Sequence, residues 1–153
     1  MASAVPLADL SRKALDVHAR IFADLAQVSR AVDALQPDEP DPLLFEQAWA
    51  QIDMLERQAR DHFRNEEAAG MPDRLRALLP DAAAEILGLQ VEHTEILDLV
   101  DRMRDRSRRC SPLAVMQLAE DVALLLDKMY AHEAMEDRLM AAALASADTA
   151  VDR

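Results

Sequence analysis

The chain contains little glycine, few aromatic residues and a single cysteine. Two glycines and 3% aromatic residues among 153 residues disfavour β architectures, whose strands are rich in aromatic and β-branched side chains. Cys110 cannot form an internal disulfide bond, so we expect a reducing, cytoplasmic environment. No stretch approaches 18 consecutive apolar residues, and the first 15 residues lack the basic and apolar segments of a secretory signal. We therefore expect neither a membrane span nor a secretory signal.

Positive charge is also scarce. The sequence has 17 lysine and arginine residues against 29 aspartate and glutamate residues, which gives a formal net charge of -12. A surface of this charge repels nucleic-acid phosphates and anionic lipids, so we expect no nucleic-acid partner and no membrane partner. The one basic run, at residues 102–110, lies where a helix is expected to end and where cations complement the helix dipole. The charge favours solubility and is compatible with a monomer or a homodimer.

What the chain does contain favours helices. Hydrophobic residues make up 51% of the sequence, and the good helix formers alanine, leucine, glutamate and arginine are abundant. Asp41 and Ser111 can cap the helices that follow them, and Gly70 suits a helix end. These residues belong to three interruptions rich in proline or glycine, at residues 36–42, 70–73 and 110–112.

The interruptions divide the chain into helical segments. We predict a short helical piece at residues 74–79 and four long helices over residues 7–36, 42–69, 80–108 and 112–146. Short connections make consecutive helices antiparallel neighbours, so the predicted fold class is all-α, an up-down-up-down four-helix bundle. We expect one domain over residues 1–147 and a frayed tail over residues 148–153.

All four histidines lie on the apolar stripes of these predicted helices, one to each helix. A stripe that takes two positions in seven would contain four randomly placed histidines about once in 150 cases. Two glutamates follow histidines by four residues and therefore share their helix face. The six residues are His18, His62, Glu66, His93, His132 and Glu136.

These six side chains are expected at nearly the same level of the bundle, because their distances from the helix starts agree when neighbouring helices are antiparallel. Burying a carboxylate without a partner costs several kcal/mol or forces a large pKa shift. A pair of divalent or trivalent metal ions would compensate such a cluster. Imidazole and carboxylate together suit iron, zinc or manganese, and two carboxylates can each bridge two metal ions.

Each part of the pattern has a structural alternative. A single histidine on a core face is usually a satisfied core residue, and a histidine four residues before a glutamate is often a surface ion pair. The coincidence on four helices favours a metal site. Glu92 and Glu133 are next to histidines in sequence but lie about 100° around their helices, so we expect them away from the site. Glu67 and Glu95 are expected on the solvated surface.

Three aromatic residues lie near the predicted cluster. Phe22 is one turn beyond His18, and Phe63 follows His62, so both could keep water away from the site, although ordinary packing is the simpler interpretation. Tyr130 precedes His132 by two residues and therefore faces another way, which favours a surface position over a proton donor to the site.

The segments "DVHAR", "HFRNE", "VEHTE" and "HEAME" together resemble the hemerythrin-like domain family, also called HHE cation-binding domains. The resemblance covers nearly the whole chain, and it implies a four-helix bundle around a non-heme di-iron centre with an oxo or hydroxo bridge. It also implies how the residues are shared between the metals. His18 and His62 would bind one iron, His93 and His132 the other, and Glu66 and Glu136 would bridge them.

The sequence departs from the family's oxygen carriers at one point. Those proteins have two histidines one turn apart on the third helix. Here the positions four residues away from His93 are Leu89 and Leu97, so the second iron would lack one protein nitrogen. This difference disfavours simple reversible oxygen carriage. It favours a more open site that senses O₂ or redox state, handles peroxide or nitric oxide, or holds iron in a labile form.

Three functions follow from these observations. The first is a cytoplasmic hemerythrin-like di-iron protein that binds or senses O₂, peroxide or nitric oxide. The second is iron storage or donation, or an enzyme that reduces peroxide or nitric oxide at the same centre. The third is a metal-free structural or interaction bundle. The six-residue layer favours the first, and binding is favoured over catalysis because the sequence offers no separate acid or base.

Overall fold

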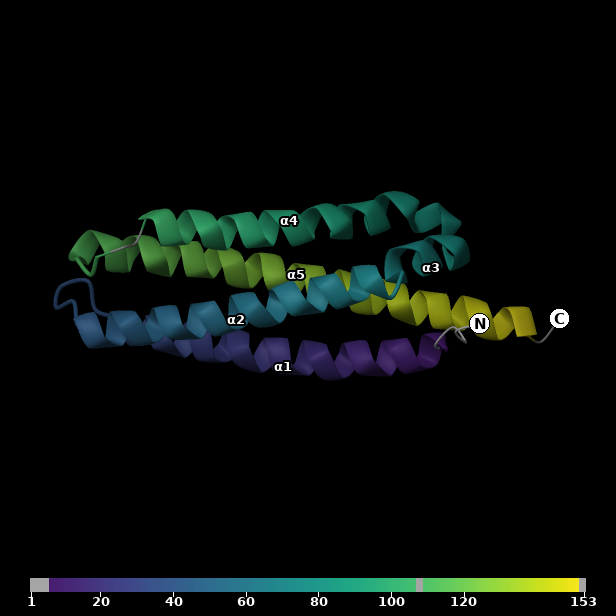
Figure 1. The fold of residues 1–153 in the computed structure, drawn as a ribbon, viewed down its shortest axis with the longest axis horizontal. Helices are drawn as coiled ribbons and strands as arrows, with labels where there is room; N and C mark the ends of the chain where they lie inside the picture. The colour runs from purple at the N-terminus through teal and green to yellow at the C-terminus, as the bar shows by residue number, and fades with distance from the viewer. Residues whose placement is uncertain (1–5, 107–108, 152–153) are drawn as a thin grey trace.

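The protein is built entirely from helices in the part of the chain that the computed structural model describes, residues 6–106 and 109–151. Figure 1 shows the long helices lying side by side, with α1 beginning and α5 ending at the same end of the bundle. The elements are α1 (Leu7–Asp33), α2 (Pro42–Ala68), α3 (Met71–Leu78), a short 3₁₀ helix (Pro80–Ala82), α4 (Ala83–Arg106) and α5 (Pro112–Val151).

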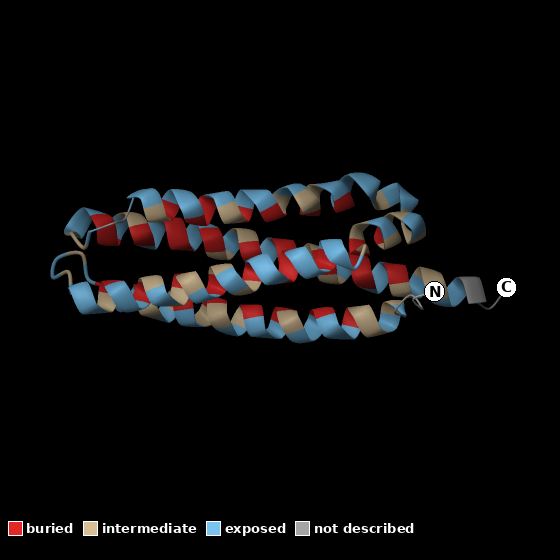
Figure 2. Ribbon diagram, in the orientation of Figure 1, coloured by how far each residue is buried: buried red, intermediate tan, exposed pale blue. Residues whose placement is uncertain are grey.

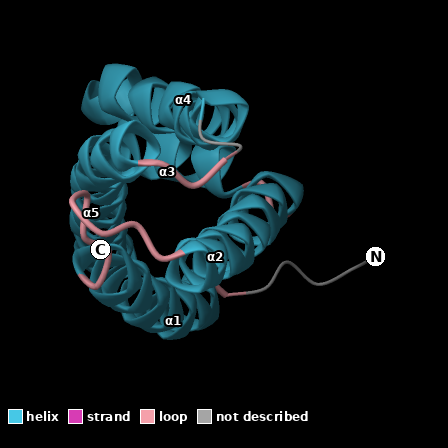
Figure 3. Cartoon of the chain, turned by 90° about the vertical axis from the view of Figure 1, so that its left-hand side faces the viewer, coloured by secondary structure: helices cyan, strands magenta, loops and turns pink. Residues whose placement is uncertain are grey.

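The arrangement of the long helices is clearest along the bundle (Figure 3). α1 packs against α2 and α5, and α4 packs mainly against α5, so that α1, α2, α4 and α5 surround a common interior. α3 lies at one end and contacts α2, α4 and α5. The all-α class predicted from the sequence is confirmed. Within the described residues, no helix combines the length and the hydropathy that crossing a membrane requires.

The helix bounds differ from the sequence prediction at several places. The short helix α3 spans Met71–Leu78 rather than residues 74–79 and so begins inside the predicted interruption at residues 70–73. α1 ends at Asp33 rather than at residue 36, because Pro37 disfavours helical backbone in the residue before it. Pro80 begins a 3₁₀ turn that leads into α4, and such turns are frequent at helix ends. α5 continues to Val151, past residue 146, because its alanine-rich end contains no helix breaker. The division into a domain over residues 1–147 and a tail over 148–153 stays a prediction.

Local sequence fixes where the helices begin. The Asp41 carboxylate accepts hydrogen bonds from the backbone N–H groups of Leu43 (2.8 Å) and Leu44 (3.4 Å) at the start of α2. The Ser111 hydroxyl accepts one from the N–H of Ala114 (3.1 Å) at the start of α5. Gly70 joins α2 to α3 with φ 67°, a left-handed conformation that favours glycine. The capping residues identified in the sequence therefore act as expected.

The basic run pairs with carboxylates at the end of α4. Arg104 donates to Asp53 (2.6 Å) and Glu56 (2.5 Å) of α2, which ties these two helices together at their edge. Arg106 donates to Asp121 of α5 at 3.3 Å. These cations also lie in the last turn of α4, where they complement the helix dipole. Residues 107–108, which the sequence prediction placed at the end of this helix, lie outside the described residues.

The buried face of each long helix points into the bundle (Figure 2), and the apolar core is divided into two clusters. The main cluster runs from the loop between α1 and α2 as far as Phe63 and Met129. The end cluster lies beneath α3 and contains residues of α1, α4 and α5. Its members are Ala14, Met71, Leu75, Ile86, Leu89, Leu139, Met140 and Ala143. The layer between the two clusters is polar.

The cap at the start of α2 gives a direct test of this local account. Asp41→Ala should lower the free energy of unfolding by about 1 kcal/mol, because two backbone N–H groups lose their side-chain acceptor. The measurement is urea denaturation of the metal-free protein. Asp38→Ala, an exposed change in the same loop, should leave the midpoint unchanged. Equal effects of the two substitutions would contradict the capping role.

Candidate metal centre

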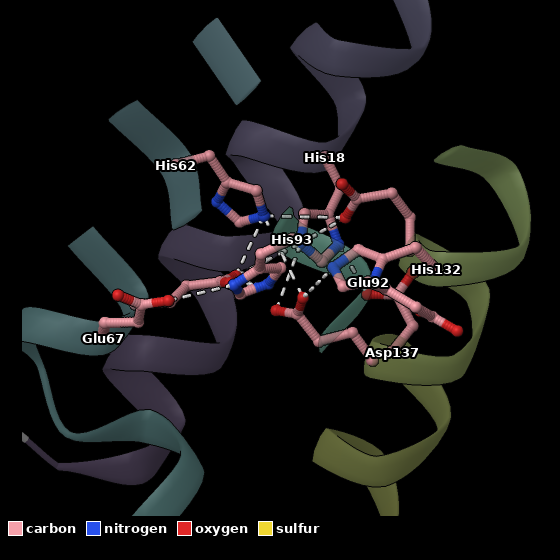
Figure 4. A network of polar contacts seen from close by, with 10 residues as sticks. His18, His62, Glu67, Glu92, His93, His132 and Asp137 are labelled. Carbon is pink, nitrogen blue, oxygen red and sulfur yellow. Dashed lines mark hydrogen bonds and ion pairs between the residues drawn. The ribbon is translucent and has the colours of Figure 1, made fainter. Parts of the chain in front are cut away.

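The polar layer contains all six side chains expected from the sequence and one more glutamate. Helices α1, α2, α4 and α5 each contribute to it, and all seven side chains are buried. Figure 4 shows the four imidazole rings facing one another across the interior. The residues are His18 of α1, His62 and Glu66 of α2, His93 of α4, and His132, Glu133 and Glu136 of α5.

Helix geometry brings each glutamate to its histidine. Residues four apart lie one turn apart on the same face, so Glu66 Oε1 comes within 2.9 Å of His62 Nε2. Glu136 Oε2 lies 3.7 Å from His132 Nε2 for the same reason. Both glutamates therefore point their carboxylates into the layer instead of forming surface ion pairs.

The imidazoles form two pairs, and Glu66 lies between them. The ring centroids of His18 and His62 are 4.9 Å apart, and so are those of His93 and His132. One oxygen of Glu66 is directed at His62, whereas its Oε2 lies 3.6 Å from His93 Nε2 in the second pair. A carboxylate in this position can contact cations on both sides.

Glu136 has the same relation to the two pairs from the opposite helix. Its Oε1 lies 3.4 Å from His18 Nε2, and its Oε2 lies 3.7 Å from His132 Nε2. The two glutamates on the predicted stripes therefore both lie between the histidine pairs. This position is compatible with the bridging role that the family resemblance implies for them, which stays a prediction.

Glu133 was expected away from the site, and this expectation is wrong. Its side chain is 0% exposed, and its Oε2 lies 2.8 Å from His18 Nε2 and 3.6 Å from His62 Nε2. The reason is the position of α5, which packs against both α1 and α4 and so buries a wide face. A residue 100° around the helix from His132 still faces the interior, on the side of α1.

Three of the four imidazoles also make a hydrogen bond on the side of the ring that faces away from the layer. In each case the Nδ1–H group donates to a carboxylate from a different helix, which orients the ring so that Nε2 faces inward (Figure 4). The distances are 2.8 Å for His18 to Asp137, 2.8 Å for His132 to Glu92 and 3.3 Å for His93 to Glu67.

These outer carboxylates were missed by sequence reasoning. Glu67 is 54% exposed and lies at the surface as expected, yet it contacts the buried His93. Glu92 is 45% exposed and contacts the buried His132, so the expectation that it lies away from the site was wrong. Their partners are on other helices, so no spacing within one helix could identify them. Glu95 does lie at the surface, where it accepts from Lys128 at 3.4 Å.

Aromatic side chains cover one side of the layer. Phe63 stacks on His93 with ring centroids 4.0 Å apart and meets the edge of His132 at 5.3 Å. It therefore contacts the second histidine pair directly. Phe22 instead stacks on Tyr130, which is 44% exposed. Tyr130 lies at the surface, as the sequence indicated.

Charge within the layer is balanced by protons when no metal is bound. Burial opposes a charge on His18 and on His62, but the neighbouring carboxylates outweigh it and raise the pKa of His18 to about 12 and that of His62 to about 9. Burial opposes the charge on Glu133 too, yet the same imidazoles lower its pKa to about 2. These three groups form a buried ionic cluster.

The pKa values of the two central glutamates, Glu66 and Glu136, shift in opposite directions. Burial disfavours charge on both, but hydrogen bonding to His18 and His62 holds the pKa of Glu66 well below its usual range. Burial and the nearby Glu66 carboxylate raise the pKa of Glu136 to about 8. Burial and the proximity of His132 lower the pKa of His93. One of the two glutamates thus keeps a proton at neutral pH, which a cation would replace.

The donor atoms fit a metal ion. Among the described residues, several buried atoms of the layer have no hydrogen-bond partner apart from the contacts between imidazole and carboxylate that form when the rings are protonated: Nε2 of His18, His62 and His132, Oε1 of Glu66 and Glu136, and both carboxylate oxygens of Glu133. One such atom from each of His18, His62, Glu133 and Glu136 lies within 4.8 Å of the others. Buried nitrogen and oxygen donors that converge without partners suit a divalent cation.

Comparison with known families agrees with this geometry. Residues 11–144 match the family model described as the hemerythrin HHE cation binding domain, so the chain belongs to this family. Membership implies that the protein binds metal ions, and the matched range includes every residue of the layer. No curated protein and no solved structure matches the chain.

The raised pKa values predict that metal binding releases protons. His62 and Glu136 have pKa values of about 9 and about 8, so both hold protons at neutral pH that a metal ion must displace. The apparent affinity for zinc should therefore rise from about pH 6 to about pH 9. Calorimetric titration in buffers with different heats of ionisation measures the released protons. An affinity that does not change with pH would contradict the prediction.

Glu133 gives a second test. Glu133→Gln keeps the size of the side chain but removes its negative charge, so zinc affinity should fall at least about tenfold in a competition titration. The matched control is Glu120→Gln, an exposed change on the same helix that should have no effect. If both variants bind zinc like the unchanged protein, Glu133 does not contribute to the site.

Proposed function

We propose that this protein is a hemerythrin-like protein that holds two iron ions in the buried layer and binds or senses O₂, peroxide or nitric oxide there. The observation that carries the proposal is the position of Glu66 and Glu136, whose oxygens are divided between two pairs of imidazoles. An up-down-up-down arrangement of the four long helices accounts for this symmetry, because each helix then contributes one histidine at the same level.

The proposed ligands fall into two sets. His18, His62 and Glu133 hold one ion, and His93 and His132 hold the other, with Glu66 and Glu136 between the two. The added carboxylate lies on the His18 side, so the His93 side has fewer protein donors. Leu89, one turn from His93, is buried in the end cluster and adds none. This imbalance supports small-molecule binding on the His93 side.

The space beside His93 supports a small ligand. A cavity of about 20 Å³ adjoins His93, Glu66 and Glu136 and is otherwise lined mainly by apolar side chains. A cavity of about 10–15 Å³ holds one water, so this one takes a molecule of diatomic size. Larger substrates do not fit there. The size therefore favours O₂ or nitric oxide.

Side chains of the protein determine the surroundings of the proposed iron ions. Iron, when bound, supplies redox chemistry that none of these side chains has. The outer carboxylates hold the imidazole rings in place, and Phe63 with the two apolar clusters keeps water from the second histidine pair. Tyr130, the phenol considered as a proton donor, faces solvent. Binding or sensing is therefore a better description than catalytic turnover.

Metal content per chain tests the proposal. Protein from iron-supplemented cells should contain about two irons and show a visible absorption band that changes with O₂. The variant His62→Ala/His132→Ala should lose most of the iron, whereas the surface control Tyr130→Phe should keep both ions. If the protein instead contains two zinc or manganese ions, the metal site is supported and the proposed redox function is contradicted. A folded protein without metal would favour the structural bundle.

A further inference from the structure

A solvent-accessible pocket between α1 and α2 leads to one edge of the metal centre. Its volume is about 540 Å³, within the range of small-molecule sites. His62 and Glu66 form part of its wall, and no other histidine does. The cavity beside His93, by comparison, has a volume of about 20 Å³. The two sides of the centre thus differ in the space available next to their histidines.

Among the described residues, His62 lacks one hydrogen bond that the other three histidines have. Within the described part of the chain it is the one histidine whose Nδ1 has no carboxylate partner, and Figure 4 shows this nitrogen turned away from the cluster. A hydrogen bond of this kind fixes the orientation of a metal-binding imidazole and strengthens metal binding. His62 lacks this hydrogen bond and borders the pocket, so it is the histidine of the centre that a ligand in the pocket reaches first.

Two cationic side chains lie on the rim of the pocket. Lys13 and Arg20 line it from α1 and, within the described residues, form no ion pair. They lie two turns apart, about 10 Å along the helix, with the small apolar wall of Ala14 and Val17 between them. Asp16 and Glu66 also line the pocket, so its lining has two cationic and two anionic side chains, with Glu66 at the inner wall beside His62. Two unpaired cations on a protein of net charge -12 still mark this place as suited to an anionic ligand.

We infer that this pocket is the port through which a small polycarboxylate chelator delivers or removes the metal ion on the His18/His62 side. The inference rests on the proposed pair of metal ions. Lys13 and Arg20 recognise the carboxylates of the chelator, and His62 is the protein ligand that the chelator replaces first. The ion on the His93/His132 side borders a much smaller cavity and exchanges more slowly. Glu133 adds a donor on the His18/His62 side, so the faster exchange inferred there comes from access through the pocket and not from a smaller number of donors.

Zinc extraction tests this assignment. Protein loaded with two zinc ions is mixed with citrate, and the zinc that stays bound is measured over time by elemental analysis after rapid desalting. One ion should leave at least about tenfold faster than the other, and the fast rate should saturate with citrate concentration. A single rate for both ions would overturn the inference. Fewer than two zinc ions at the start would contradict the metal pair itself, and the inference with it.

Charge reversal tests the role of the rim. Lys13→Glu/Arg20→Glu should slow the fast phase about tenfold with citrate but not with the uncharged chelator 1,10-phenanthroline. The control Arg12→Glu/Arg64→Glu makes the same change in net charge at two exposed positions outside the pocket. It should change neither rate. A citrate rate that is insensitive to the charge of Lys13 and Arg20 would contradict an anion-binding rim.

Filling the pocket tests the route. Ala69→Phe places a large side chain at an exposed position that lines the pocket, so it should slow the fast phase with both chelators and leave the slow phase unchanged. The neighbouring exposed residue Ala68 does not line the pocket, and Ala68→Phe should have no effect. If the two substitutions act alike, zinc leaves by another path.

Discussion

The structure depends on charge balance in one buried layer. Four imidazoles and three carboxylates are held in an apolar bundle, where an uncompensated charge costs several kcal/mol. Protons can balance the layer in part, as the raised pKa values of His18, His62 and Glu136 indicate. They cannot give every inward-facing oxygen a partner of its own, because the single Nε2 of His18 lies within 4.0 Å of Glu66, Glu133 and Glu136 at once. A bound cation can contact several of these donor atoms at the same time.

The position of α5 explains how so many ligands reach one place. Most surface helices bury a single stripe, and the other long helices contribute one or two side chains each. α5 contacts α1 on one side and α4 on the other, so it buries a wider face and supplies His132, Glu133 and Glu136. It also supplies Asp137, which holds His18 from outside the layer. The centre is therefore built around this helix, and the two histidine pairs lie on its two flanks.

Helix periodicity was enough to predict the interior residues but not those that support them. The repeats that placed His18, His62, His93 and His132 on apolar stripes depend on one helix at a time, as do the caps at Asp41 and Ser111. Glu133 required knowledge of which helices flank α5. The outer carboxylates, such as Glu92, required the partner across a helix interface. Sequence spacing carries no such information, because contacts between helices depend on their relative rotation and on packing.

The division of the apolar core by the polar layer has a consequence for folding. The end cluster beneath α3 shares no buried residue with the main cluster, and α1, α4 and α5 contribute to both clusters and pass through the layer between them. Regions joined by few apolar contacts can open as separate cooperative units. Mutual repulsion or unmatched charge in the layer weakens the link between the two units, whereas a bound cation strengthens it. Metal occupancy is thus expected to determine whether the two halves of the bundle unfold together or one after the other.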